Sequence, residues 1–313
     1  MYRIKTFIAA ILLLGLTASC NIPRDVNIST ETVSVPLPPT ATVESEPPTP
    51  RPVLSAETLR SADYALPVYE KHVTLVDGTF QGDEEPDKLR VTLLPQIAWG
   101  DLDGDGLEDA VVLLAENNGG SGVFVSLLVM VNNGGQPRQS AAVLVDDRPR
   151  IDSLEINNGS IIMQGVIHAA DDVMAIPTLA VTEIYRYSAG SGDLDLVNFA
   201  SGKIDGMKHI IRMERPVDGQ EIGGTLRIVG DMPVGPFENN LRFRVYGLNG
   251  DVLIEEPFGV ESEDMGMPAS FDKEVNLAAI PPDSTIRIEL AELSMKDGSL
   301  MSMASVRGLK VDQ

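Results

Sequence analysis

The sequence predicts a mainly β protein, with an N-terminal antiparallel β-meander domain that includes a short helix, followed by a β-sandwich domain. Three observations favour this fold class. Apolar runs of strand length are separated by Asn-Gly and other Gly-rich turn signals. Aromatic residues make up only 5% of the 313 residues, whereas 28 Gly and 21 Pro recur at short intervals. The length also allows about two domains.

Composition and charge restrict the possible partners. The chain has 46 Asp and Glu residues against 24 Lys and Arg residues, which gives a formal net charge of −22. Phosphate backbones repel such a chain, so nucleic acid is not an expected partner. Cys20 is the single cysteine, which rules out an intrachain disulfide and a cysteine-based zinc or iron–sulfur cluster.

Residues 1–20 have the features of a lipoprotein signal peptide. Arg3 and Lys5 precede an apolar run over residues 7–16, which is too short to span a bilayer but has the length of a signal-peptide core. Residues 16–20 resemble the lipobox of bacterial lipoproteins, with the usual Leu one place early. The resemblance implies that Cys20 is lipidated and anchors the mature N-terminus in a membrane. A cleaved signal peptide with a free Cys, or an uncleaved anchor, is the alternative.

Residues 21–54 predict a disordered tether. The segment is rich in Pro, Thr, Ser and Val and has no apolar pattern that could form a core. Pro-rich chains favour extended polyproline-like conformations of about 3 Å per residue, which would hold the folded part away from a lipid surface. A Pro-rich ligand for a partner domain is the alternative interpretation.

Residues 55–200 predict the β-rich first domain. Ser55 can cap a short helix that continues to about Ser61, with Glu57 in its first turn. Asn-Gly pairs between the apolar runs that follow supply the positive φ angles of tight hairpins. The strand candidates are residues 88–94, 110–115, 123–131, 141–145, 151–156, 161–167 and 179–187.

An aspartate-rich loop within this domain predicts a cation site. Its carboxylates occupy positions 1, 3, 5 and 9, and Gly106 at position 6 permits a sharp turn, so the oxygens can converge on a hard cation. Val112 stands where an EF-hand has a bidentate Glu, and the flanking runs resemble strands rather than helices. The predicted Ca²⁺ ligands are Asp101, Asp103, Asp105, the main-chain carbonyl of Leu107, and Asp109.

The loop resembles the calcium loops of FG-GAP and VCBS-type repeats, in which a strand, an aspartate loop and a second strand follow one another. It occurs once in the chain, so a propeller of many repeats is not predicted. A calcium ion bound there is expected to fix the turn between two core strands and to take no part in catalysis. The alternative is an acidic, solvated hairpin whose aspartates form side-chain turns.

Other candidate sites have little support. His72, His168 and His209 lie far apart in the sequence and form no metal-binding pair. His168 could lie near Asp171 and Asp172, although the segment after strand 161–167 is expected to be an exposed loop. The sequence contains no nucleophile elbow and no phosphate-binding Gly-rich loop, so no enzymatic activity is predicted.

Residues 205–313 predict a β-sandwich. About seven strand candidates occur at sandwich spacing, and apolar residues alternate with Arg over residues 241–245, so one face is expected to be buried and the other wet. Phe237 is expected in the core, and an exposed Phe237-Glu238 corner that serves as a contact surface is the alternative. The strand candidates are residues 210–213, 221–229, 240–246, 252–258, 269–277, 285–293 and 301–311.

This second domain resembles the immunoglobulin-like domain of bacterial spore germination proteins. The residues that carry the resemblance are Ile211, Pro216, Gly219, Phe271 and the segments 226–230, 237–241, 248–253 and 295–299. The resemblance implies an immunoglobulin-like β-sandwich on an exported protein and supplies no catalytic residues. The further modules that sometimes accompany this domain in germination proteins are not evident in the sequence.

Together these features predict a non-enzymatic protein of the cell envelope. It would be exported and anchored by lipidated Cys20 to the outer face or the periplasmic side of a membrane, with two β modules for binding or spacing. The expected partners are the membrane and either a cell-wall polymer or another envelope protein. The alternatives are an enzyme that acts on peptidoglycan or glycan through the aspartate loop, and a calcium-dependent adhesin.

Overall fold

The computed structural model describes residues 51–82, 88–203, 206–264 and 266–312. Residues 50–313 form one compact unit, which does not include residues 1–49. The predicted signal peptide, Cys20 and residues 21–50 of the predicted tether therefore lie outside the described residues. Within the described part of the chain, no helix has the length and apolar character needed to cross a bilayer.

The predicted short helix is present as α1 (Ala56–Arg60). Ser55 caps it: its hydroxyl accepts a hydrogen bond from the Thr58 N–H at 3.1 Å, and the Thr58 hydroxyl accepts one from the Ser55 N–H at 3.1 Å. The buried Leu59 packs with a small two-stranded sheet of β1 (Asp63–Ala65) and β2 (His72–Thr74). These elements cover one face of the sheet that follows.

A five-stranded antiparallel sheet forms the first layer, in the order β3-β4-β5-β6-β7. Its central strands are buried on both faces, because Val112 of β5 belongs to the core beneath α1 and its neighbour Val111 belongs to the core on the other side. This sheet is a meander, as predicted. The strands are β3 (Thr79–Gln81), β4 (Arg90–Gly100), β5 (Asp109–Asn117), β6 (Phe124–Asn133) and β7 (Gln136–Asp147).

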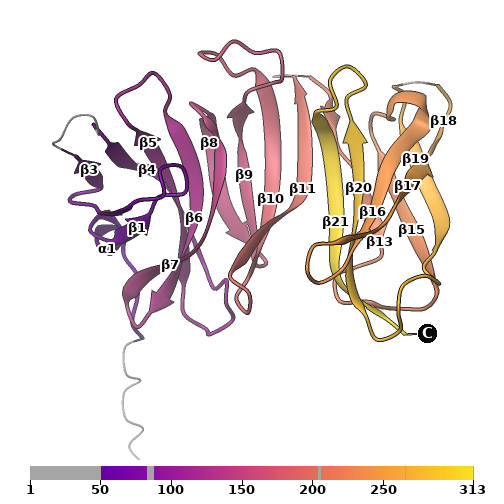
Figure 1. Cartoon of the computed structure of the whole chain (residues 1–313), viewed down its shortest axis with the longest axis horizontal. Coiled ribbons are helices and arrows are strands. Elements are labelled where there is room, and N and C mark those ends of the chain that lie inside the picture. Colours follow the sequence, from indigo (N-terminus) through magenta and orange to yellow (C-terminus); the bar gives the residue numbers. More distant parts are fainter. Residues whose placement is uncertain (1–50, 83–87, 204–205, 265, 313) are drawn as a thin grey trace, which may run out of the picture. The chain divides into compact units, whose positions relative to one another are not determined.

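A ten-stranded sheet runs through both halves of the folded unit (Figure 1). Its main path is β17-β16-β20-β21-β11-β10-β9-β8, and β12 and β14 pair at its side. All its pairings are antiparallel except that of β14 with β21. The strands are β8 (Arg150–Asn157), β9 (Ser160–Ile167), β10 (Leu179–Ser188), β11 (Asp193–Lys203), β12 (Lys208–His209), β14 (Glu221–Ile222), β16 (Asn240–Tyr246), β17 (Val252–Gly259), β20 (Thr285–Leu293) and β21 (Leu300–Val311).

A four-stranded antiparallel sheet completes the second half, in the order β13-β15-β19-β18. It packs over a core that includes Phe243, Phe258 and Phe271. The ring centroid of Phe258 lies 6.2 Å from that of Phe243 and 5.6 Å from that of Phe271. The two layers form the predicted sandwich. The strands are β13 (Arg212–Arg215), β15 (Thr225–Met232), β18 (Glu261–Ser262) and β19 (Ala269–Asn276).

The second half differs from the sequence prediction in several details, and the short strand β18 is one that was not predicted. The single strand expected over residues 221–229 is two strands, β14 and β15, because Gly223 and Gly224 interrupt it where the chain changes sheets. Phe237, expected in the core, is 46% exposed. It lies in one 3-10 turn (Phe237–Asn239) before β16, outside the alternation that buries Leu241 and Phe243.

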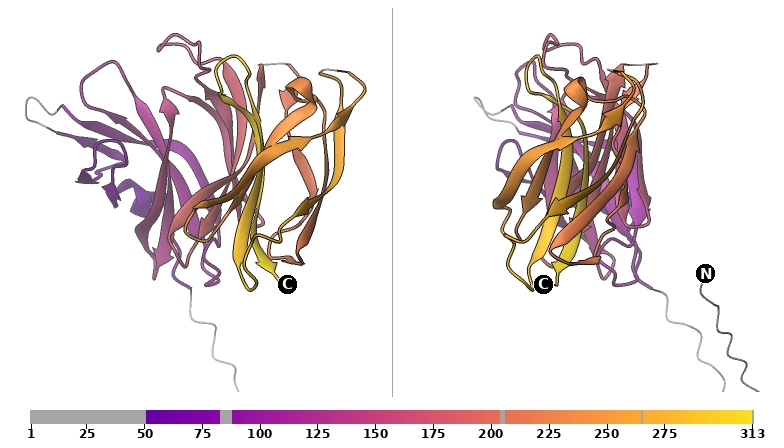
Figure 2. Two further views of the ribbon diagram at one scale, coloured as in Figure 1. Left: turned by 45° about the vertical axis from the view of Figure 1, so that its right-hand side comes forward. Right: turned by 90° about the vertical axis from the view of Figure 1, so that its right-hand side faces the viewer.

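The shared sheet is covered on opposite faces at its two ends. Phe199 of β11 is opposite Glu183 of β10 and Met303 of β21, so these side chains lie on one face. Tyr185 lies on that same face, where the five-stranded sheet packs. Ala304 lies on the other face and belongs to the core beneath the four-stranded sheet. The sheet therefore continues across the predicted boundary at residues 200–205 (Figures 1 and 2).

Candidate metal centre

The aspartate loop joins β4 to β5 in a hairpin closed by the pair Gly100 and Asp109. Gly104 and Gly106 have φ angles of +83° and +82°, which a side chain would strain. These glycines let the loop fold back on itself, so carboxylates that are distant along the loop come together.

Three of the predicted ligands meet in this loop. Asp101, Asp103 and Asp109 each offer a carboxylate oxygen, and these oxygens lie within 4.8 Å of one another. Asp109 is fully buried, whereas the other two side chains are more exposed. It is the only such group of His, Cys, Asp or Glu among the residues that the structure describes. An all-oxygen donor set of this kind fits Ca²⁺.

The other two predicted ligands are not part of this group. Asp105 accepts a hydrogen bond from the Leu107 N–H at 2.7 Å, so its carboxylate caps its own turn. The carbonyl of Leu107 stays a predicted ligand. Asp101 also accepts hydrogen bonds from the N–H groups of Gly104 and Gly106, at 2.7 and 3.0 Å. An acidic hairpin without a cation would make the same turns.

The electrostatics of Asp109 favour a nearby positive charge. Burial raises the pKa of this carboxyl, and the charge of Asp103 raises it further. The N–H groups of Asn132 and Leu102, which donate to it at 2.8 and 2.9 Å, lower the pKa but do not cancel the effect of burial. A bound cation would favour the ionised carboxylate and reverse this shift.

Asn132 links the aspartate loop to the segment that enters the folded unit. Its N–H donates to Asp109, and its side-chain amide donates to the carbonyls of Glu108 and Pro52 at 3.2 and 3.1 Å. Arg51 donates to the carbonyl of Gly106 at 3.1 Å. Sequence reasoning missed both contacts, because the Asn-Asn-Gly-Gly run containing Asn132 indicated only a hairpin turn.

His168 has a different partner from the one considered in the sequence. Its Nδ1 lies 2.8 Å from a carboxylate oxygen of Asp146 on β7, and the same oxygen accepts the His168 N–H at 2.6 Å. Asp172 instead accepts the Ala169 N–H at 2.8 Å. The ring is also only 15% exposed rather than fully solvated. Burial lowers the pKa of His168, but the hydrogen bond and charge of Asp146 outweigh it and raise the pKa overall.

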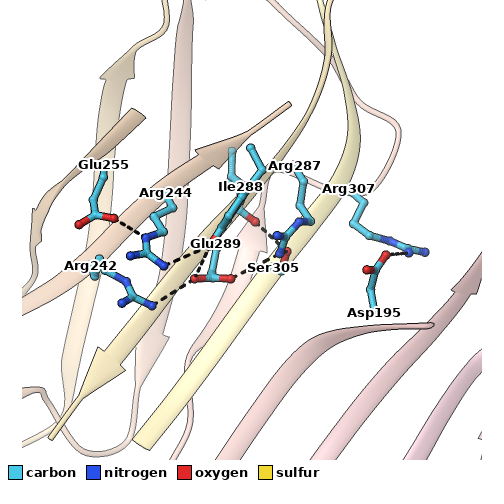
Figure 3. Close-up of polar contacts among 10 residues, drawn as sticks. Asp195, Arg242, Arg244, Glu255, Arg287, Ile288, Glu289, Ser305 and Arg307 are labelled. Atoms are coloured by element: carbon cyan, nitrogen blue, oxygen red, sulfur yellow. Dashed lines mark hydrogen bonds and ion pairs between the residues drawn. The ribbon is translucent and has the colours of Figure 1, made fainter. Parts of the chain in front are cut away.

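The polar face of the second sandwich holds a network around Glu289 of β20 (Figure 3). Arg242 and Arg287 approach its two oxygens at 3.5 and 3.4 Å, and the Tyr246 hydroxyl donates to it at 3.2 Å. The guanidinium of Arg287 also lies 3.9 Å from the Tyr246 ring centroid. The predicted alternation is confirmed, and the arginines pair with carboxylates of this half rather than forming an open basic surface.

One ion pair of this face crosses between the two halves. Arg307 of β21 donates to Asp195 of β11 at 2.8 Å (Figure 3). Its side chain is 22% exposed, so solvent screens the pair only in part. The contact reinforces the junction that β11 and β21 make through their main chains.

Comparison with known families supports the fold of the second half. Residues 210–299 match the family model described as the immunoglobulin-like domain of bacterial spore germination. This match confirms the resemblance predicted from the sequence, and the antiparallel sheets confirm the mainly β fold with one short helix. Searches among curated proteins and among solved structures found no match. The class defined here is an immunoglobulin-like domain joined through one sheet to a second β unit.

Proposed function

We propose that this chain is a non-enzymatic, lipid-anchored protein of the cell envelope, whose folded unit binds or spaces a cell-wall polymer or another envelope protein. The observation that carries the proposal is the immunoglobulin-like domain at residues 210–299, which is named for bacterial spore germination. The signal-like residues 1–20, with Cys20 at the lipobox position, support export and anchoring.

Calcium has a structural role in this proposal. Asp101, Asp103 and Asp109 would hold the ion, with the Leu107 carbonyl and water as further ligands. When bound, the ion neutralises the charge gathered between β4 and β5. Asp109 and Asn132 then hold the loop against the segment at Pro52, so the end of the tether is fixed to the folded unit.

Expression of the full chain and of Cys20→Ser in a bacterium tests the anchor. The unchanged chain is expected in the membrane fraction, with a covalent lipid detected by mass spectrometry. Cys20→Ser is expected in the soluble exported fraction with its fold intact. Equal membrane association of the two proteins, with no lipid on Cys20, would contradict the proposal.

A pull-down with the folded unit as bait tests the partner. We expect an envelope protein or purified cell-wall polymer to be retained, and retention to survive removal of calcium if the ion only stabilises the loop. Loss of surface attachment in chelator, with the fold retained, would favour the adhesin instead. Turnover of peptidoglycan that Asp103→Ala abolishes would favour the enzyme.

A further inference from the structure

A cavity of about 760 Å³ lies at the junction of the two halves. The first half contributes the end of β9, the start of β10, part of β11 and the segment after β9. The second half contributes β12 and the residues just before it, Val234, the start of β21 and the turn before that strand. Cavities of this size at domain junctions are typical small-molecule sites. Its apolar lining includes Ile167, Leu179, Leu196, Phe199, Met207 and Leu300.

The apolar lining continues a buried cluster on one face of the shared sheet. Leu179 is opposite Ile167, and Phe199 is opposite Met303, so side chains from β9, β10, β11 and β21 form one floor. A rigid sheet holds this floor in place, which lowers the ordering cost for a ligand that packs against it.

His209 provides a polar group in the wall of the cavity. Nδ1 of His209 lies 2.9 Å from a carboxylate oxygen of Glu292, which is only 3% exposed and also accepts the Ser302 hydroxyl at 2.9 Å. A neutral ring that donates from Nδ1 to this carboxylate has a hydrogen-bond acceptor at Nε2. Nε2 has no hydrogen-bond partner among the described residues.

Several other polar side chains at the cavity already have partners. The ring nitrogens of His168 contact Asp146 and the carbonyl of Met174. Ser201 donates its hydroxyl to the carbonyl of Met301 at 2.6 Å. At the rim of the cavity, Lys296 of the turn before β21 pairs with Asp171 of the segment after β9, so both halves contribute to the rim.

We propose that this cavity binds a small neutral amphiphile, with an apolar body against Phe199 and Leu300 and a hydroxyl that donates to Nε2 of His209. A neutral head group fits better than an anionic one. Lys203 also lines the cavity, but so do Asp171 and Asp297, and the chain carries a net charge of −22. This site does not depend on the lipid anchor or on calcium.

Calorimetric titration of the full chain carrying Cys20→Ser tests the site with three probes that share a ten-carbon chain. 1-Decanol supplies the hydroxyl donor, decyl methyl ether lacks it, and decanoate replaces it with an anion. We expect saturable binding of one 1-decanol per chain, and about tenfold weaker binding of the ether, because one hydrogen bond is lost. Tighter binding of decanoate than of 1-decanol would overturn the proposal.

Three variants locate the binding. Ala170→Trp places a bulky ring in an exposed lining segment and is expected to abolish binding of both neutral probes, whereas Ala189→Trp, in the exposed turn after β10, keeps it. His209→Phe is expected to remove the preference for 1-decanol over the ether. If His209→Phe does not fold, the comparison of Ala170→Trp with Ala189→Trp tests the location of the site by itself. Unchanged binding in Ala170→Trp would place the probe elsewhere and overturn the proposal.

Discussion

Phe199 and Met303 are direct partners across β11 and β21, although they belong to different halves of the chain. Both side chains are only 5% exposed, and together with Val181 and Ala291 they form a small core of their own. The junction is therefore a continuation of the sheet rather than a flexible linker. The five-stranded sheet packs on one face of the shared sheet, and the four-stranded sheet packs on the opposite face. Each half therefore contributes a strand, β11 or β21, that pairs with the other half.

Phe199→Ala is expected to destabilise both halves together. Loss of a buried aromatic ring costs about 3 kcal/mol, and the shared sheet makes the halves unfold in one transition. Thermal unfolding followed by calorimetry measures this effect. Leu248→Ala removes an apolar side chain that is 80% exposed and serves as the control, with an unchanged midpoint expected. Two separate transitions, of which only one shifts, would contradict a single cooperative unit.

Calcium is expected to raise the melting temperature of the folded chain, with a midpoint on the order of 0.1 to 1 mM. Ca²⁺ at 100 times its dissociation constant would add about 2.7 kcal/mol to the free energy of unfolding. Asp103→Ala should abolish this stabilisation, because its carboxylate belongs to the converging group. Asp105→Ala is the matched control and should keep most of it, because Asp105 caps its own turn. A titration that is flat in the unchanged protein would refute the metal site.

His168→Gln is expected to destabilise the protein more at acidic than at alkaline pH. The Asp146 carboxylate raises the pKa of His168 in the folded state, so its contribution is complete below the unfolded pKa of about 6.5. That contribution is lost as pH rises through the folded pKa. Urea unfolding at pH 5.5 should show a loss of about 1 kcal/mol, and a smaller one at pH 9.

The exposed residue His72 provides the control for this pH effect. His72→Gln should leave the urea midpoint unchanged at both pH values. An equal loss for His168→Gln at pH 5.5 and pH 9 would mean that the ring acts by packing alone.

Asn132→Ala is expected to release the segment at Pro52 from the folded unit. The side chain makes three hydrogen bonds, to Pro52, Glu108 and Gly135, so its loss should cost about 2 kcal/mol. Hydrogen exchange at the amides of Val53 and Leu54 should become faster. Asn133→Ala, at an exposed neighbouring position, should change neither quantity. Unchanged exchange in Asn132→Ala would show that other contacts hold this segment.

Much of the fold could be predicted because the strands follow simple local rules. Residues 241–245 alternate between apolar side chains and Arg, and Leu241, Phe243 and Val245 are buried as that alternation requires. The helix was predictable from Ser55, whose capping needs only residues three positions away. The strands β1, β2 and β3 were missed, because three residues are too few to show a period. The longer strand β11 was also missed, although it forms the junction between the two halves.

The candidate site was predictable in part for the same reason. The spacing of Asp101, Asp103 and Asp109 within one loop brought them together as expected, whereas the local turn of Asp105 depends on its bond to Leu107. Contacts between distant segments could not be predicted. Asp146 reaches His168 only because β7 packs near β9, and Ser201 reaches Met301 across 100 positions of sequence.

The shared sheet also constrains the order in which the strands can pair during folding. β10 and β11 are neighbours in the sequence and can pair early, but the other edge of β11 pairs with β21, the last strand that the structure describes. Until that final strand arrives, the edge presents unpaired main-chain groups to any neighbouring strand. Pairing over so long a separation in sequence is slow, so this edge stays open to pairing with another chain until β21 has folded against it.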